Sequence, residues 1–400
     1  MKIILAYSGG LDTSIALAWL RETYDAEVIA FCANLGQFED LEVARDRALK
    51  NGATKVLVED LREDFVTQYA FRALKAGAVY EDKYFMAASL SRPLIARRLV
   101  EIAGQEGAEA VAHGASGKGN DQIRFFAGVA RLNPRLRVIA PLMEWDLKTR
   151  QAQIDYAHQR GVSMPPFKTS PYSRDTNIWG SSVECGPLDD MSLAPPEEVY
   201  AITQSPQLAP EEPQVLSITF ERGVPTKVDD EALDPVELVE RLNEIGGRHG
   251  VGRVDIIENR LVGIKVRGVY ESPAATILHD AHRELENLVF ERDLFQYKIM
   301  VSHKYAELVY DAKWFSGLRE SLDAFVESTQ EEVSGVVEVR LYRGSVTTLT
   351  RTSPGSLYRH DLASYESADG FDLKAGVGFS YIWSMPARVS GVAARRRPRG

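Results

Sequence analysis

A cluster of glycines, hydroxyls and one carboxylate directly follows the first apolar run of the chain. Ile3 to Tyr7 is typical of a buried strand, and residues 13–23 have the pattern of a helix. Residues 8–14 (SGGLDTS) connect the two. The glycines let the backbone turn tightly and approach a ligand, and the first N–H groups of the helix attract anions. The segment therefore predicts a phosphate-binding site.

Asp12 makes this prediction more specific. A carboxylate beside a phosphate is repulsive unless a metal ion or a sugar hydroxyl lies between them. The simpler expectation is Mg²⁺, held by the phosphate oxygens and in part by Asp12. The hydroxyls of Ser8, Thr13 and Ser14 add hydrogen-bond donors. In the plainer alternative, Asp12 or Ser8 caps the helix and the glycines only turn. The segment lacks the Lys-Ser/Thr pair of a Walker A loop.

A second cluster, residues 113–125 (HGASGKGNDQIRF), follows another short strand. Lys118 and Arg124 can neutralise a carboxylate or a phosphate, whereas Asn120 and Asp121 can hold an ammonium group. Opposite charges so close in sequence favour a zwitterionic ligand over the alternative, a glycine turn with a solvated lysine.

A third segment, residues 246–255, is rich in glycine and leads to Glu258 and Tyr270. Considered alone, it favours a structural turn followed by a strand, with a surface acid and a packing aromatic.

The elements that must position these residues alternate between strand and helix in the first third of the chain. The expected strands are 3–7, 27–31, 55–58, 110–112 and 137–140, and the expected helices are 13–23, 41–51 and 92–106. This alternation predicts an α/β fold, with a doubly wound parallel sheet covered by helices on both faces. Ligands bind such sheets at the carboxyl ends of the strands, where the polar segments begin.

The pattern changes in a proline-rich stretch, residues 164–213, and a mixed α+β region begins near Val215. Its expected strands are 215–220 and 336–342, and its expected helices are 235–245, 281–289 and 317–332. The basic end, residues 395–399, is expected to be a solvated tail.

Composition narrows the class of protein. The formal net charge is −10 and the pI about 5.4, which disfavours nucleic acid as a partner. No apolar stretch is long enough for a bilayer, so no membrane partner is expected. With only Cys32 and Cys185, we expect no disulfide framework and a reducing, cytoplasmic location.

The segment SGGLDTS resembles the PP-loop of the N-type ATP pyrophosphatases, which cleave ATP between the α- and β-phosphates. More of the chain resembles the argininosuccinate synthase family, in segments 6–14, 78–81, 113–124, 171–173, 242–255 and 268–271. The resemblance implies a ligase that forms a C–N bond: L-citrulline, L-aspartate and ATP give argininosuccinate, AMP and pyrophosphate through a citrullyl adenylate, as a step of arginine biosynthesis.

The resemblance also implies site residues. It assigns ATP binding to Ala6, Tyr7, Ser8, Gly9, Gly10, Leu11, Asp12, Thr13, Ser14, Ala33 and Gly114. It assigns citrulline to Tyr84, Ser89, Asn120, Arg124, Ser173, Ser182, Glu258 and Tyr270, and aspartate to Ser116, Asn120 and Asp121. The residues expected to act in catalysis are Asp12, Ser14 and Arg124.

The implied organisation has three parts. Residues 1–165 would be the nucleotide-binding domain, 166–370 the synthetase domain, and 371–400 an oligomerisation segment with the basic tail. The resemblance implies a homotetramer in which residues 378–394 reach across subunits.

Some positions depart from the family's pattern. Ser116 stands where threonine is common, Phe126 where an acid is expected, and Cys185 within a stretch usually Glu-Gly-Gly. Ala274 and Ala275 replace a glycine pair. These departures bear on local loop geometry.

Other functions remain open from the residues alone. A tRNA-thiolating PP-loop enzyme would need a reactive cysteine, for which Cys32 is a candidate, and an amidating enzyme would need a glutaminase partner. An ATP-sensing protein would bind nucleotide without turnover.

Overall fold

The computed structural model describes residues 1–165, 170–366 and 370–396. Residues Met1–Gly355 form one compact unit and Ser356–Gly400 a second. The expected domain boundary at 165/166 lies at the edge of the described residues. Residues 397–400, which include the end of the predicted basic tail, lie outside them.

The first unit begins with a parallel sheet whose strands run in the spatial order β3-β2-β1-β4-β5. Its strands are β1 (Lys2–Ala6), β2 (Glu27–Asn34), β3 (Lys55–Asp60), β4 (Ala110–Ala112) and β5 (Arg137–Ile139). All four strand pairings are parallel, and Ile4 of β1 lies opposite Ile29 of β2 and Val111 of β4. The expected doubly wound α/β fold is therefore confirmed.

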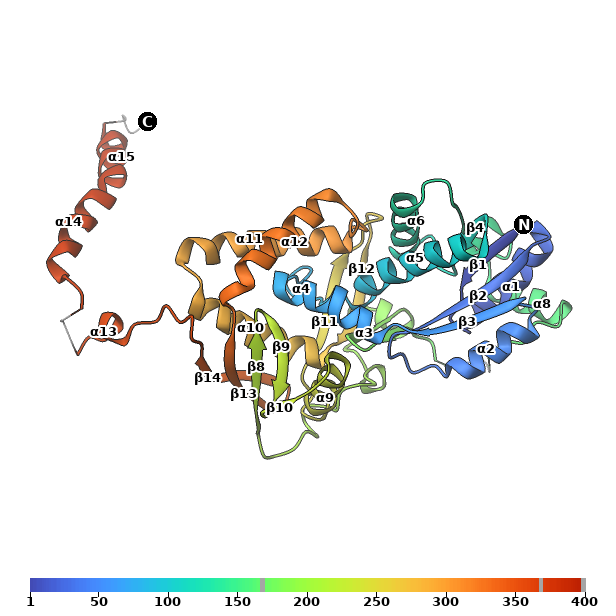
Figure 1. The fold of residues 1–400 in the computed structure, drawn as a ribbon, viewed down its shortest axis with the longest axis horizontal. Coiled ribbons are helices and arrows are strands. Elements are labelled where there is room, and N and C mark those ends of the chain that lie inside the picture. The colour runs from blue at the N-terminus through green and yellow to red at the C-terminus, as the bar shows by residue number, and fades with distance from the viewer. Residues whose placement is uncertain (166–169, 367–369, 397–400) are drawn as a thin grey trace. The chain divides into compact units, whose positions relative to one another are not determined.

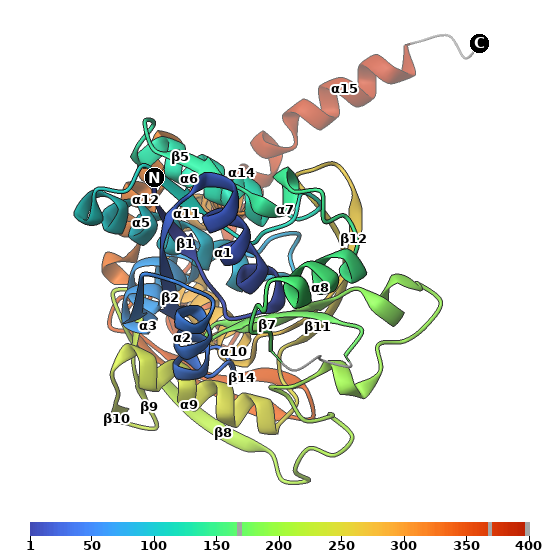
Figure 2. The same ribbon diagram turned by 90° about the vertical axis from the view of Figure 1, so that its right-hand side faces the viewer.

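The central strands β1, β2 and β4 are largely apolar and buried because helices cover both faces of the sheet, whereas the edge strand β3 carries charged residues at its ends. The covering helices are α1 (Leu11–Tyr24), α2 (Leu41–Lys50) and α5 (Ala87–Glu106). Ile3 and Leu5 pack with α1 and α2, whereas Ile4 packs into the core that contains α5. Figures 1 and 2 show α2 and α5 on opposite sides of the sheet.

Helix α5 differs from the sequence prediction, which started it at Arg92 with Pro93 in its first turn. The helix begins at Ala87, so Pro93 lies in its interior. Proline has no N–H to donate to the carbonyl four residues earlier, that of Ser89. The helix nevertheless continues, since its apolar face is buried against the sheet.

The other helices of the first 165 residues are short. They are α3 (Arg62–Phe65), the π-helical turn η1 (Val66–Ala70), α4 (Phe71–Ala76), α6 (Asp121–Leu132), α7 (Pro141–Glu144) and α8 (Arg150–Gln159). Helix α6 packs against α5, and α8 contacts α1. These contacts bring the start of α6 and the start of α8 near the carboxyl edge of the sheet.

The rest of the first unit contains antiparallel sheets. One has the order β11-β12-β7-β6, with β6 (Ser173–Asn177), β7 (Gly180–Glu184), β11 (Arg253–Asn259) and β12 (Lys265–Glu271). The other has the order β10-β9-β8-β13-β14, with β8 (Gln214–Glu221), β9 (Val224–Val228), β10 (Glu231–Ala232), β13 (Gly335–Tyr342) and β14 (Ser345–Thr352). The expected α+β character is present, although β6, β7, β9, β10, β12 and β14 were not predicted.

Helices complete this part of the unit. They are α9 (Pro235–Arg248), α10 (Pro273–Val289), α11 (Arg292–Tyr310), α12 (Gly317–Thr329) and the 3-10 turns η2 (Gly186–Asp189), η3 (Glu197–Val199) and η4 (Gln330–Glu332). The prediction for α10 began at Ala281, eight residues too late, because the Ser272-Pro273 start signal was not used. Ala274 and Ala275, which replace the glycine pair, are fully buried in its first turn.

The second unit consists of α13 (His360–Ala363), α14 (Leu373–Trp383) and α15 (Met385–Arg395). Large apolar side chains of α14 are exposed, with Val377 at 75% and Trp383 at 73%. Within the described part of the chain, no helix is both long and apolar enough to cross a bilayer.

A buried polar network joins α10, α11, α4 and η4. Lys298 Nζ donates to Glu286 Oε1 at 2.8 Å and to the carbonyl of Lys75 at 2.7 Å. Gln330 Nε2 also donates to Glu286, at 3.0 Å. Burial raises the pKa of Glu286, but the Lys298 charge, His282 and the hydrogen bonds from Lys298 and Gln330 together more than offset this, so the net pKa is lowered.

We predict that Lys298→Met lowers the free energy of unfolding by about 3 kcal/mol, since it leaves Glu286 buried without its counter-charge. Because the folded pKa of Glu286 is depressed, its contribution is present at neutral pH and is lost as pH falls through that folded pKa. Urea unfolding at pH 7 measures the change. Lys304→Met, in an exposed pair on the same helix, is the control and should cost less than about 1 kcal/mol. Equal losses in the two variants would contradict the prediction.

Candidate active site

The turn between β1 and α1 has the geometry of an anion site. Gly9 has φ +74°, and a Cβ there would lie 2.6 Å from the Cβ of Ala44, so only glycine fits. Gly10 is the N-cap residue of α1, and no side chain caps the helix there. The first N–H groups of the helix therefore remain available to a ligand. The alternative that Asp12 or Ser8 merely caps the helix is thereby disfavoured.

Hydroxyl groups line this turn. The Ser8 and Thr13 hydroxyls lie 3.1 Å apart, and Tyr7 Oη lies 2.9 Å from the buried Ser14 Oγ. Arg47 of α2 donates to the carbonyl of Gly9 at 2.5 Å. This arginine, which the sequence analysis did not identify, fixes the turn and adds positive charge beside it.

Asp12 is the carboxylate of the turn. Burial raises its pKa, and the opposing charge of Arg150, 3.4 Å away at the start of α8, only partly offsets this. No group of three or more His, Cys, Asp or Glu side chains that would hold a metal occurs among the described residues. A single carboxylate with nearby hydroxyls fits Mg²⁺ that is bound chiefly through phosphates.

The loops after β1 and β4 meet at the point where the strand order reverses. A Cβ on Gly114 would lie 2.7 Å from the methyl carbon of Thr13. Ala33, near the end of the neighbouring strand β2, is held by Gln37, whose Nε2 donates to its carbonyl at 2.7 Å. The residues predicted for ATP therefore gather at one edge of the sheet, as expected for this fold.

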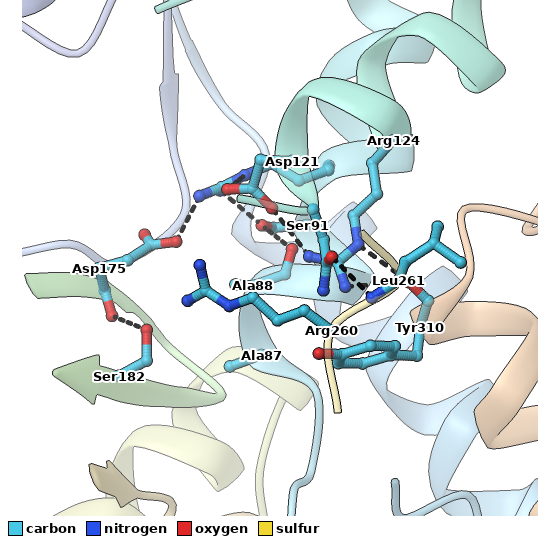
Figure 3. A network of polar contacts seen from close by, with 12 residues as sticks. Ala87, Ala88, Ser91, Asp121, Arg124, Asp175, Ser182, Arg260, Leu261 and Tyr310 are labelled. Carbon is cyan, nitrogen blue, oxygen red and sulfur yellow. Dashed lines mark hydrogen bonds and ion pairs between the residues drawn. The ribbon is translucent and has the colours of Figure 1, made fainter. Parts of the chain in front are cut away.

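A chain of ion pairs runs from this edge to the antiparallel sheet (Figure 3). Asp121, the first residue of α6, pairs with Arg92 of α5 and with Arg124, each at 2.8 Å. Arg92 also pairs with Asp175 of β6. Arg124 donates to the Tyr310 carbonyl at 3.0 Å, and its guanidinium lies 5.1 Å from the Tyr310 ring centroid. Burial alone would raise the pKa of Asp121, but the two arginines lower it.

Asp121 and Arg124 were expected to contact the ammonium of aspartate and the carboxylate of citrulline. Both Asp121 oxygens already accept from arginines, and Nε, Nη1 and Nη2 of Arg124 each donate to the protein. A ligand would use the remaining lone pairs and N–H groups of these side chains.

A second group of charges surrounds Glu258, which is buried. Tyr270 Oη donates to Glu258 Oε2 at 2.8 Å, and Arg260 Nε lies 3.5 Å from Glu258 Oε1. Arg260 also pairs with Glu184. Burial raises the pKa of Glu184, against the opposing charge of Arg260. Glu258 is therefore a buried carboxylate fixed by its neighbours, and not the surface acid that its local sequence suggested.

Aromatic rings complete this group. Tyr84 stacks on Tyr270 with ring centroids 4.2 Å apart, and Tyr80 stacks on Tyr310 at 3.6 Å. Burial raises the pKa of Tyr270 far above its ordinary value, with the Glu258 charge adding to the effect, so its hydroxyl stays a donor.

The predicted serines differ in their burial and in their hydrogen bonds. Ser182 lies opposite Tyr270 in the register of β7 and β12, and its hydroxyl donates to the Asp175 carbonyl at 3.4 Å. Ser89 is buried, and its Oγ has no hydrogen-bond partner within the described residues. Ser173 begins β6 and is exposed, and Ser116 is exposed in the loop after β4.

Asn120 connects the two groups. It is buried, and its Oδ1 accepts from the backbone N–H of Leu261 at 3.0 Å. Because Leu261 follows Arg260, this bond ties the loop after β4 to the hairpin that follows β11.

Two departures from the family's pattern lie near these residues. Cys185 has φ +72° and ψ 178°, a conformation that favours glycine, and it directly follows Glu184. Phe126 is partly exposed on α6 and meets the ring of His113 edge-on at 5.8 Å.

Cys32 does not suit thiolation. It is fully buried in β2, and burial raises the pKa of its thiol to about 12, so the thiolate is scarce at neutral pH.

Several site residues besides Arg47 were missed: Arg92, Asp175, Glu184, Arg260 and Tyr310. The alternation of side chains along a strand offered a signal for two of them. Glu184 stands two residues after Ser182, and Arg260 stands two residues after Glu258, so each is expected on the same face as its predicted neighbour. Nothing in the local sequence marks Arg92, Asp175 or Tyr310.

Comparisons with known proteins identify the family of the chain. Residues 2–163 match the arginosuccinate synthase N-terminal HUP domain, and residues 172–390 match the arginosuccinate synthase C-terminal domain. The chain is 52% identical to the argininosuccinate synthase of Carboxydothermus hydrogenoformans, over 97% of both chains. It is also 51% identical to that of Chlorobium phaeobacteroides, over 96% of both chains, and 52% identical to that of Moorella thermoacetica, over 97% of this chain and 95% of the relative. The chain belongs to the argininosuccinate synthase family.

Proposed function

We propose that this chain is a ligase of arginine biosynthesis that condenses L-citrulline with L-aspartate at the expense of ATP, giving argininosuccinate, AMP and pyrophosphate. Family membership supports the reaction, and one observation carries its local assignment. The anion-binding turn at Gly9 and Gly10 lies at the same sheet edge as the loop that supplies Asn120, Asp121 and Arg124.

The reaction has two steps. The ureido oxygen of citrulline attacks the α-phosphorus of ATP, which releases pyrophosphate and leaves a citrullyl adenylate. The amine of aspartate then attacks the ureido carbon, AMP leaves with the ureido oxygen, and the amine loses a proton. Neither step needs a side-chain nucleophile, so the protein contributes positioning and charge stabilisation.

At the ATP end, the proposed ligands are the residues that the resemblance named, from Ala6 to Ser14 with Ala33 and Gly114. The free N–H groups at the start of α1 suit phosphate oxygens. Ser14 is also among the proposed ligands, and its hydroxyl is buried 2.9 Å from Tyr7 Oη. Mg²⁺, when bound, would neutralise phosphate charge, and Asp12 is the carboxylate that would share it.

At the amino-acid end, Glu258 suits the ammonium of citrulline, since it is buried and held by Tyr270. Ser89 is a further proposed citrulline ligand, because its buried hydroxyl has no partner within the described residues and Pro93 gives its carbonyl no N–H. The further proposed citrulline ligands are Tyr84, Asn120, Arg124, Ser173, Ser182 and Tyr270. For aspartate they are Ser116, Asn120 and Asp121.

We predict that isotope exchange between pyrophosphate and ATP requires citrulline and proceeds without aspartate, because the adenylate forms before the amine attacks. The measurement follows labelled pyrophosphate into ATP with each substrate omitted in turn. ADP as a product, or exchange that is indifferent to citrulline, would sink the proposal.

The raised pKa of Asp12 predicts a pH effect. Asp12 must be ionised to share Mg²⁺, so activity falls as pH drops through its pKa, at a higher pH than for an ordinary aspartate. Arg150 holds that pKa down, so Arg150→Met should move the acid limb of the pH–rate profile upward by roughly half a unit to one unit. Arg160→Met, at the far end of the same helix and paired with Glu22, is the matched control and should not move it. An unmoved limb in Arg150→Met counts against Asp12.

We propose the organisation expected from the sequence: residues 1–165 as the nucleotide-binding domain, 166–370 as the synthetase domain and 371–400 for assembly into a homotetramer in the cytoplasm. The first of these parts also supplies proposed amino-acid ligands, from Tyr84 and Ser89 to the segment that ends at Arg124. The exposed apolar side chains of the second unit support the role in assembly. They include Leu373, Val377, Phe379, Ile382, Trp383, Val389 and Val392. A surface of this kind favours burial against another chain.

Truncation after Gly355 should therefore lower the oligomeric state while nucleotide binding persists, since every proposed site residue precedes it. Light scattering gives the mass of the full and the truncated chains, and nucleotide titration checks the site. An unchanged mass would exclude this role for the second unit.

A further inference from the structure

Arg260 occupies a junction that none of the assigned roles explains. It follows β11, and its backbone N–H donates to the Ile264 carbonyl at 2.9 Å, which closes the β11–β12 hairpin. Its side chain is only 12% exposed. In Figure 3 the side chain extends from the Tyr310 side of the site toward the side that carries Asp175 and Ser182.

The guanidinium joins two carboxylates from different strands. It pairs with Glu184 at the end of β7 and lies 3.5 Å from Glu258 on β11. Tyr270 holds the other oxygen of Glu258. The Glu258 carboxylate is thus fixed from both sides, while the charge of Glu184 is taken up by Arg260. One negative charge of the pair remains uncompensated, which suits a single ammonium group.

The same residue also holds the loop proposed for aspartate. Arg260 Nη1 donates to the Lys118 carbonyl at 3.3 Å, and the next residue, Leu261, donates its N–H to Asn120 at 3.0 Å. The hairpin tip therefore contacts the Ser116–Asp121 loop through two hydrogen bonds. Citrulline and aspartate must meet within bonding distance, so this contact sets the spacing of their two subsites.

We propose that Arg260 is a positioning residue of the ligation: it fixes Glu258 for the citrulline ammonium and holds the Ser116–Asp121 loop against it. This inference rests on the proposed function. Arg260 acts through Glu258 and the loop, so its loss should weaken binding of both amino acids more than it slows turnover.

Arg267 provides a matched control on the neighbouring strand β12. Its side chain is 7% exposed and pairs with Asp255 at 2.7 Å. Its remaining donors bind the carbonyls of Asp190 and Leu193. Removing it deletes a comparably buried guanidinium with no contact to Glu258, Glu184 or the loop.

The experiment compares Arg260→Met, Arg260→Lys and Arg267→Met by steady-state kinetics with citrulline, aspartate and ATP each varied. For Arg260→Met we expect KM for both amino acids to rise about tenfold, because the variant loses about the free energy of one charge-assisted hydrogen bond. We expect kcat to change by less than about threefold and KM for ATP to stay unchanged. Arg260→Lys should fall between this variant and the unaltered protein, because an ammonium cannot span both carboxylates and the Lys118 carbonyl. Arg267→Met should leave all three KM values unchanged.

Thermal unfolding of each variant separates misfolding from this effect, and if Arg260→Met does not fold, the Lys variant carries the same comparison. The inference is overturned if Arg260 variants match Arg267→Met, if kcat alone falls, or if all three KM values rise together. If the unaltered protein forms no argininosuccinate, the proposed function fails instead, which a product assay on that protein shows first.

Discussion

Buried charge requires a partner, and this requirement connects the two ends of the site. Asp175 on β6, Arg92 on α5, and Asp121 and Arg124 on α6 form a continuous chain of ion pairs. Arg124 is buried, so loss of Asp121 would leave the guanidinium charge desolvated without this counter-charge, whereas the partly exposed Asp175 pair contributes less. The antiparallel sheet that carries Asp175 is therefore held against helices that pack on the parallel sheet. The relative placement of the proposed nucleotide and amino-acid residues depends on this chain.

One segment serves both ends. The loop after β4 starts at Gly114, close enough to Thr13 that no Cβ fits between them, and ends at Asn120 and Asp121. Its position follows from the strand order, because β4 lies beside β1 and both strands point their carboxyl ends to the same edge. If aspartate and ATP bind as proposed, the nucleophile at the far end of this loop would lie close to the phosphate at its near end. Proximity of this kind is a large part of catalysis in a reaction without a protein nucleophile.

The sequence predicted those elements well whose structure depends on residues close together in the chain. The strand at 3–7, the glycine turn and the helix after it follow from apolar runs, backbone freedom and helix termini, and the structure confirms them. The start of α5 was missed because Pro93 normally marks a first turn, whereas burial against the sheet sustains the helix around it. Arg92 and Asp175 were missed because their partners lie far along the chain, and pairing across elements leaves no local pattern. The contact of Asn120 with Leu261 was missed for the same reason, because the two residues lie far apart in the sequence.

The charges of the amino-acid end suit a preorganised site. Asp121 keeps a lowered pKa despite burial because Arg92 and Arg124 flank it, and Tyr270 keeps its proton because burial and Glu258 raise its pKa. Both groups thus hold fixed protonation states across the neutral range, so little reorganisation is needed when a zwitterion enters. Asp12 differs, since burial raises its pKa and only Arg150 opposes this. A cation beside the proposed metal-sharing carboxylate would favour its ionised form and oppose the effect of burial, as expected where phosphate charge arrives with a cation and leaves with pyrophosphate.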